Sequence, residues 1–87
     1  MRESGFSHED ALAGIYSFGG NIYVHLEELK PGLAATIMVF DMLGKQVHNQ
    51  QMITAYATVD FSHQPSGSYI VQMEVENAIT RKQVFVW

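Results

Sequence analysis

The stretch that decides the fold is Gln64–Trp87, QPSGSYIVQMEVENAITRKQVFVW. After a Pro-Ser-Gly turn, apolar and polar residues alternate, which predicts a half-buried β-strand over Ser68–Glu76. Asn77–Ala78 is expected to be a two-residue hairpin loop, because Asn tolerates the positive φ of such loops. The hairpin would lead into a strand over Ile79–Trp87. The side chains expected on the buried face of the first strand are Tyr69, Val71, Met73 and Val75.

The same period of two, interrupted by turn residues, extends back to Gly14. Further strands are expected at Ile15–Phe18, Asn21–Glu27, Ala35–Asp41, Lys45–Met52 and Ala55–Phe61. No segment has the length and periodicity of an amphipathic helix. The sequence therefore predicts an all-β fold, a seven-stranded antiparallel β-sandwich of immunoglobulin-like architecture. The core is expected to include Val24, Val39, Val59, Tyr69, Val71 and Val84.

Length and composition predict one domain, over residues 14–87 of the 87. Residues 1–13 lack the apolar core of a signal peptide and are expected to be a linker or tag remnant. With hydrophobic residues at 47%, no apolar run is long enough to span a membrane. A net charge of −4 with five Lys and Arg argues against binding to nucleic acid. The absence of cysteine excludes disulfides and thiolate metal sites.

Two of the expected strands are apolar on both faces. In one, Ile37 and Val39 oppose Met38 and Phe40. In the terminal strand, Val84 and Val86 oppose Phe85 and Trp87. Either these strands are central and covered on both sides, or one set forms an exposed patch that serves a partner or self-association. A third alternative is that these are singly exposed apolar residues, which are normal on a protein surface. The residues of this possible interface are Met38, Phe40, Phe85 and Trp87.

Residues suited to catalysis or metal binding are scattered. The segment QPSGSY lacks the Gly-x-Ser-x-Gly turn of a serine hydrolase, and neighbours such as Ser62 and His63 point to opposite faces of a strand. The histidines lack metal-ligand spacing; they are His8, His25, His48 and His63. We therefore expect no enzyme activity, no cofactor and no metal site.

Three short motifs occur in order along the second half of the chain. Asp41, Gly44, Lys45 and Val47 match Asp-x-x-Gly-Arg/Lys-x-Val. Phe61, Pro65, Gly67, Tyr69, Ile70 and Val71 match Leu/Phe-x-x-x-Pro-x-Gly-x-Tyr-hydrophobic-Val. Lys82 and Val84, next to Arg81, match a final lysine-containing strand. With these motifs the chain resembles the C-terminal sorting domain, type A, of cargo proteins of the type IX (Por) secretion system. The front differs, since it reads YSFGGNIYV where the family carries an Asn-Pro pair.

The resemblance implies a secretion signal that directs an upstream cargo domain through the periplasm and across the outer membrane to the cell surface or beyond. It implies as partners the outer-membrane secretion machinery and a sortase-like peptidase that removes the domain. Turn geometry alone accounts for Gly44, Pro65 and Gly67, whereas folding alone accounts less well for the position of Lys82 and of the terminal strand. The residues also permit an alternative, a non-catalytic interaction or carbohydrate-binding module. Its possible stacking aromatics are Tyr16, Tyr23, Tyr56 and Trp87.

Overall fold

The computed structural model describes residues 13–27, 29–30 and 32–87. It contains seven β-strands: β1 (Ala13–Phe18), β2 (Asn21–Leu26), β3 (Ala35–Asp41), β4 (Gln46–Met52), β5 (Tyr56–Asp60), β6 (Gly67–Val75) and β7 (Ala78–Val86). The expected linker, apart from residue 13, lies outside the described residues, as does His8.

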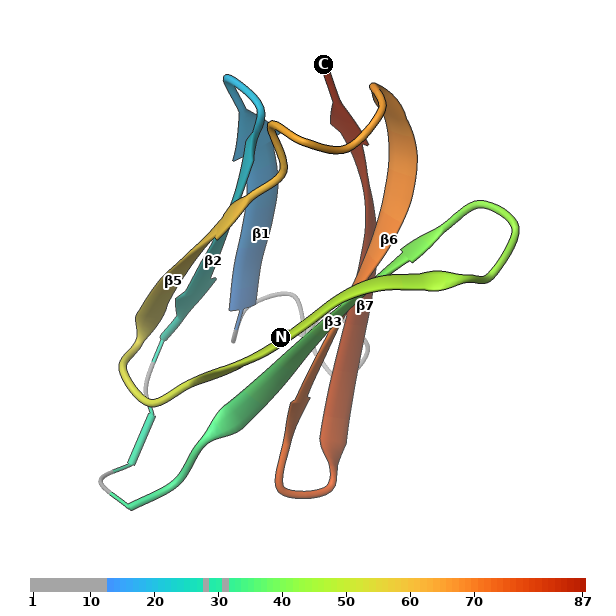
Figure 1. Cartoon of the computed structure of the whole chain (residues 1–87). Helices are drawn as coiled ribbons and strands as arrows, with labels where there is room; N and C mark the ends of the chain where they lie inside the picture. The colour runs from blue at the N-terminus through green and yellow to red at the C-terminus, as the bar shows by residue number, and fades with distance from the viewer. Residues whose placement is uncertain (1–12, 28, 31) are drawn as a thin grey trace, which may run out of the picture.

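The strands form two antiparallel sheets, one in the order β1-β2-β5 and the other in the order β4-β3-β6-β7. Figure 1 shows the two sheets as facing layers, with the β3–β4 hairpin projecting from the body of the sandwich. The prediction of a seven-stranded antiparallel β-sandwich is confirmed.

The core lies between the two sheets and consists of the inward-facing residues of the alternating strands. Phe61 is the largest fully buried side chain, and its ring meets the Tyr69 ring edge-on at a centroid distance of 4.8 Å. The six residues predicted from the alternation are all buried: Val24, Val39, Val59, Tyr69, Val71 and Val84. In β2 and β6, a period of two was sufficient to assign the buried face.

The turn between β6 and β7 differs from the prediction by one residue. Val75 pairs with Ala78, so the loop is Glu76-Asn77 and not Asn77–Ala78. The positive φ falls on Glu76, at 53°, although Asn tolerates this conformation better. The register of the sheet, and not the local preference of Asn, therefore determines which residue has the positive φ. The other strand ends match the expectation or differ from it by one or two residues.

The two strands that are apolar on both faces occupy different places. β3 is an interior strand of its sheet, and the outward Met38 and Phe40 are half-buried. β7 is an edge strand and its outward side chains are exposed, so the alternative that it is central and covered on both sides is wrong. Phe85 is 55% exposed and Trp87 62% exposed. The edge of β7 lies beside β1, where the Ser17 hydroxyl donates a hydrogen bond to the Phe85 carbonyl.

Candidate functional site

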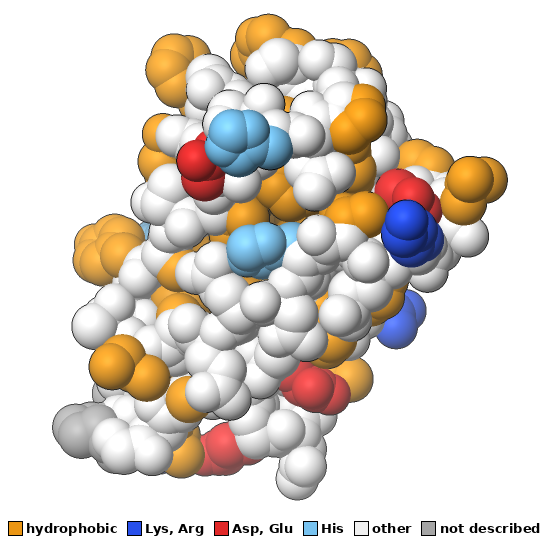
Figure 2. Space-filling model, in the orientation of Figure 1, with side chains coloured by type: hydrophobic (Ala, Val, Ile, Leu, Met, Phe, Trp, Pro, Cys, Tyr) orange, Lys and Arg blue, Asp and Glu red, His pale blue; other side chains and the backbone are white. Residues whose placement is uncertain are grey.

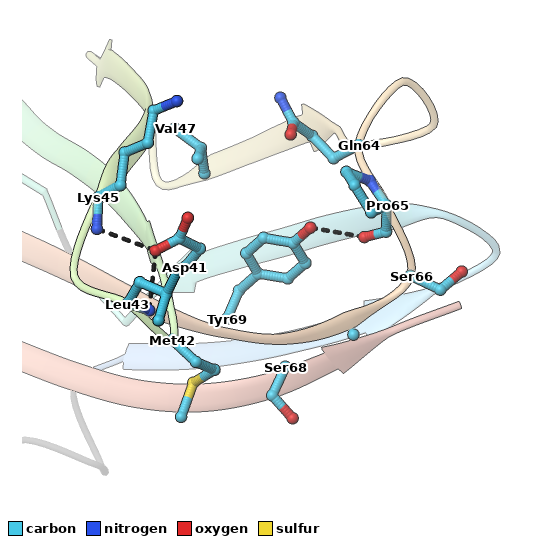
Figure 3. A pocket seen from close by; sticks show the side chains of 11 residues that line it. Asp41, Met42, Leu43, Lys45, Val47, Gln64, Pro65, Ser66, Ser68 and Tyr69 are labelled. Atoms are coloured by element: carbon cyan, nitrogen blue, oxygen red, sulfur yellow. Dashed lines mark hydrogen bonds between the residues drawn. The ribbon is translucent and has the colours of Figure 1, made fainter.

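Residues of the first two motifs meet at one end of the sandwich. They line an open depression of about 420 Å³, here called the motif depression, between the β3–β4 hairpin and the loop that enters β6. Asp41 and Tyr69 are cross-strand partners there. Figure 3 shows the Tyr69 ring lying between Asp41 and Pro65. The motif residues that line it are Asp41, Lys45, Val47, Pro65, Gly67 and Tyr69.

Asp41 holds the tip of the β3–β4 hairpin. Its Oδ1 accepts hydrogen bonds from the backbone N–H groups of Leu43 and Lys45, both at 2.9 Å. Gly44 closes the turn at φ 89°, a conformation that L-residues with a side chain rarely adopt. Because the backbone is fixed in this way, Met42 and Leu43 are directed outward, and Leu43 is 94% exposed.

We expect Asp41→Ala to destabilise the domain by about 1–2 kcal/mol, since two backbone hydrogen bonds of about 0.5–1.5 kcal/mol each lose their acceptor. Asp41→Asn keeps an oxygen at the acceptor position and should lose less than half of that amount. Chemical denaturation of the three proteins measures the difference. Equal losses for the two variants would show that charge, and not the hydrogen bonds, matters at this turn.

Tyr69 fixes the other wall of the motif depression. The Tyr69 hydroxyl donates a hydrogen bond to the Pro65 carbonyl, while the ring is buried against Phe61. Gly67 has φ 154°, again a value that favours glycine. The Pro-x-Gly-x-Tyr motif thus anchors its own loop to the core through a buried ring.

The basic pair of the third motif is split between the two faces of β7, as consecutive residues of a strand must be. Arg81 lies opposite Gln72 and Lys82 lies opposite Val71. Arg81, with Gly44, lines a second open depression of about 450 Å³, here called the Arg81 depression. The two depressions share Asp41 and Met42. The structure therefore brings Arg81 to the other motifs and does not place Lys82 with them.

Among the possible interface residues, only Phe40 lines either depression. Phe85 and Trp87 stack on each other with ring centroids 6.1 Å apart. On the face shown in Figure 2, the Lys and Arg side chains lie at the side where the β3–β4 hairpin projects. Met38 faces outward on β3 opposite Gln72 and takes no part in the lining.

Gln72 is a site residue that the sequence analysis did not single out. It is buried, with 8% of its surface exposed, and its Oε1 accepts a hydrogen bond of 2.6 Å from Arg81 Nε. The sequence could have indicated this contact. A hairpin with its loop at Glu76-Asn77 makes Gln72 and Arg81 direct cross-strand partners. Placing the loop one residue later pairs Arg81 with Glu74 instead.

The aromatic residues considered for sugar stacking each pair with a neighbour in the same chain. Tyr16 stacks on Tyr23 at 5.2 Å, and Tyr56 stacks on His25 at 4.5 Å. These contacts shield one face of each ring and stabilise the outer surface of the β1-β2-β5 sheet.

Side chains capable of proton transfer have local structural partners. His48 Nε2 and Gln50 Oε1 are 2.8 Å apart. The Ser62 hydroxyl and backbone N–H donate to Asp60 and lower the pKa of that carboxyl. No three His, Asp or Glu residues of the described chain are grouped closely enough to hold a metal ion.

Comparison with known proteins identifies the domain. A family model described as "Secretion system C-terminal sorting domain" matches residues 18–86. Among solved structures, the chain is similar to a DUF3244 family protein with an immunoglobulin-like β-sandwich fold from Bacteroides vulgatus. The TM-score is 0.76 at 16% identity, over 97% of this chain and 93% of the other. A search of curated proteins found no match.

The described residues include no helix that is long and apolar enough to cross a membrane. The family match extends over most of the sandwich and contains all three motifs. The chain belongs to the family of secretion system C-terminal sorting domains, the sorting signals of type IX secretion.

Proposed function

We propose that residues 14–87 carry an upstream cargo protein from the periplasm across the outer membrane, and that the secretion machinery reads the end of the sandwich that contains both depressions. The sorting function, with export to the cell surface or the extracellular space, follows from membership of the family. The observation that supports the choice of surface is the convergence of Asp41, Lys45, Pro65 and Tyr69 around one depression. Periplasmic transit and removal by a sortase-like peptidase belong to the same proposal.

The chemistry of this end suits recognition by another protein. Hydrogen bonds and buried rings fix its backbone, so the free surface would lose little conformational freedom on binding. Met42 and Leu43 offer exposed apolar area, and Lys45 adds a positive charge on a chain whose net charge is −4. Arg81 adds a positive charge at the second depression, whereas Lys82 lies on the other face of β7 and lines neither depression.

We expect residues 14–87, fused behind a periplasm-targeted reporter, to bring the reporter to the surface of a bacterium that has this secretion system. The same fusion without β7 should leave the reporter in the periplasm, because the sheet loses an edge strand that buries Val84 and Val86. Protease accessibility on intact cells measures surface display. Equal display of the intact and truncated fusions would contradict the proposal.

A further inference from the structure

Gln72 and Arg81 together form a polar pair with unused hydrogen-bond donors. Arginine has only donors, so the Gln72 atom that meets Arg81 Nε must be the amide oxygen. This fixes the orientation of the amide. The second polar atom of the side chain is then the nitrogen Nε2, which is a hydrogen-bond donor. None of the hydrogen bonds found within the described residues uses that nitrogen. A buried amide N–H group without an acceptor is costly and is normally found with a partner.

The Arg81 guanidinium is held in place while its ends remain available. Nε is engaged by the buried Gln72, which directs the remaining N–H groups of the planar fork. Arg81 itself is exposed. The acidic residue in the lining of the Arg81 depression is Asp41, and its Oδ1 already accepts two backbone N–H groups. The lining therefore carries one positive and one negative charge, and its unused donors are the free N–H groups of Arg81 and Gln72.

The rest of the lining is apolar. Phe40, Met42 and Ile70 form the walls next to Gln72 and Arg81. Phe40 and Ile70 are direct cross-strand partners, so they form a continuous surface beside the polar pair. A ligand that fits this lining has two acceptor oxygens for the free N–H groups of Arg81 and Gln72, with apolar atoms close to them.

We propose that the Arg81 depression binds an Asp or Glu side chain of an extended, otherwise apolar peptide segment of the secretion machinery, with the carboxylate taking N–H groups from Arg81 and Gln72. This assignment rests on the sorting function proposed above. A single guanidinium and one amide match the single charge of a carboxylate. A doubly charged phosphate would need more positive charge than this net-negative chain provides there.

Glu74 is the natural competitor for Arg81. It lies two residues from Gln72 on the same face of β6 and opposite Ile79 on β7, outside the lining of the depression. Its carboxylate weakens the positive potential at Arg81 through space. Glu74→Gln should therefore strengthen binding of an acidic peptide, whereas a substitution of Arg81 should weaken it.

The binding test uses the whole chain and two probes, acetyl-Leu-Glu-Leu-amide and acetyl-Leu-Gln-Leu-amide, which differ by one charge. The Glu peptide should shift the NMR signals of Arg81 Nε–H and Gln72 Nε2 in a saturable way. The Gln peptide and Arg81→Gln should each reduce affinity roughly tenfold, the effect of a charge-assisted hydrogen bond. Lys82→Gln is the matched control and should leave affinity unchanged, because Lys82 faces the other side of β7. Equal shifts with both peptides, or no shifts, would overturn the site.

The export test separates this inference from the sorting function. In the full precursor in its own bacterium, deletion of residues 14–87 should abolish surface delivery. Arg81→Gln should reduce it and Lys82→Gln should not, with thermal midpoints equal to that of the parent. Export of the deletion variant would overturn the sorting function. Loss of export on deletion together with parental export of Arg81→Gln would overturn only the assignment of the depression to the machinery.

Discussion

Replacing Val84 with aspartate is expected to leave the domain largely unfolded at neutral pH. Val84 is 6% exposed and faces the core from β7. The substitution removes about 1.5–3 kcal/mol of hydrophobic burial and forces a carboxylate to be buried or protonated, at a cost of several kcal/mol more. A chain of 87 residues has roughly 4–13 kcal/mol of stability in total. Circular dichroism with thermal melting measures the result.

Gln83→Asp is the matched control, because it places the same side chain one residue away on an exposed position of β7. Its effect should stay within about 0.5 kcal/mol, as for most surface substitutions. If Val84→Asp melted with the same midpoint as Gln83→Asp, the inward orientation of Val84 would be wrong.

Phe61→Ala should destabilise the domain by about 3–5 kcal/mol, the range for removing a buried aromatic ring. Phe61 is 1% exposed and meets the Tyr69 and His48 rings edge-on. Its loss leaves a cavity beside Tyr69 and so loosens the loop that Tyr69 anchors through Pro65. Denaturant titration gives the free energy of unfolding.

The same residue type on the surface provides a control for that substitution. Phe85→Ala removes a ring that is 55% exposed and stacks only on Trp87 among aromatic neighbours of the described chain. We expect a loss of less than about 1 kcal/mol. A loss similar to that of Phe61→Ala would mean that the Phe85 face of β7 is packed and not a free surface.

Alternation along the strands predicted much of the fold. In β2 and β6, one face is apolar and the other mostly polar, and the structure buries Val24 and Val71 as predicted. The exposure of β7 was harder to predict, because Val84, Phe85, Val86 and Trp87 are all apolar. The alternation also contains no information on which strands lie next to a given strand. The place of β7 at the edge of its sheet depends on long-range pairing, which local sequence does not encode.

The candidate site was predictable only in part. The motifs gave Asp41, Lys45 and Tyr69, and cross-strand pairing brings them together. The Gln72–Arg81 contact was missed because a turn placed one residue late shifts every pair across the hairpin by two positions. Asn has the stronger local preference for positive φ, yet the observed register gives that conformation to Glu76. A shift of two positions leaves Tyr69, Val71 and Met73 on the core face in either register, so alternation alone could not choose between the two.

The contact of β7 with β1 has a consequence for the kinetics of folding. Ser17 and Phe85 are 68 residues apart in the sequence, and the hydrogen bond between them joins the first and the last strands. Contacts of this separation must be formed against the entropy of closing a long loop, and β-sandwiches accordingly fold in milliseconds to seconds. The two sheets cannot be closed along this side until the residues of β7 are available. A chain that lacks β7 leaves this side of the sandwich open, so the two sheets close together only when the whole of the sandwich from β1 to β7 is present.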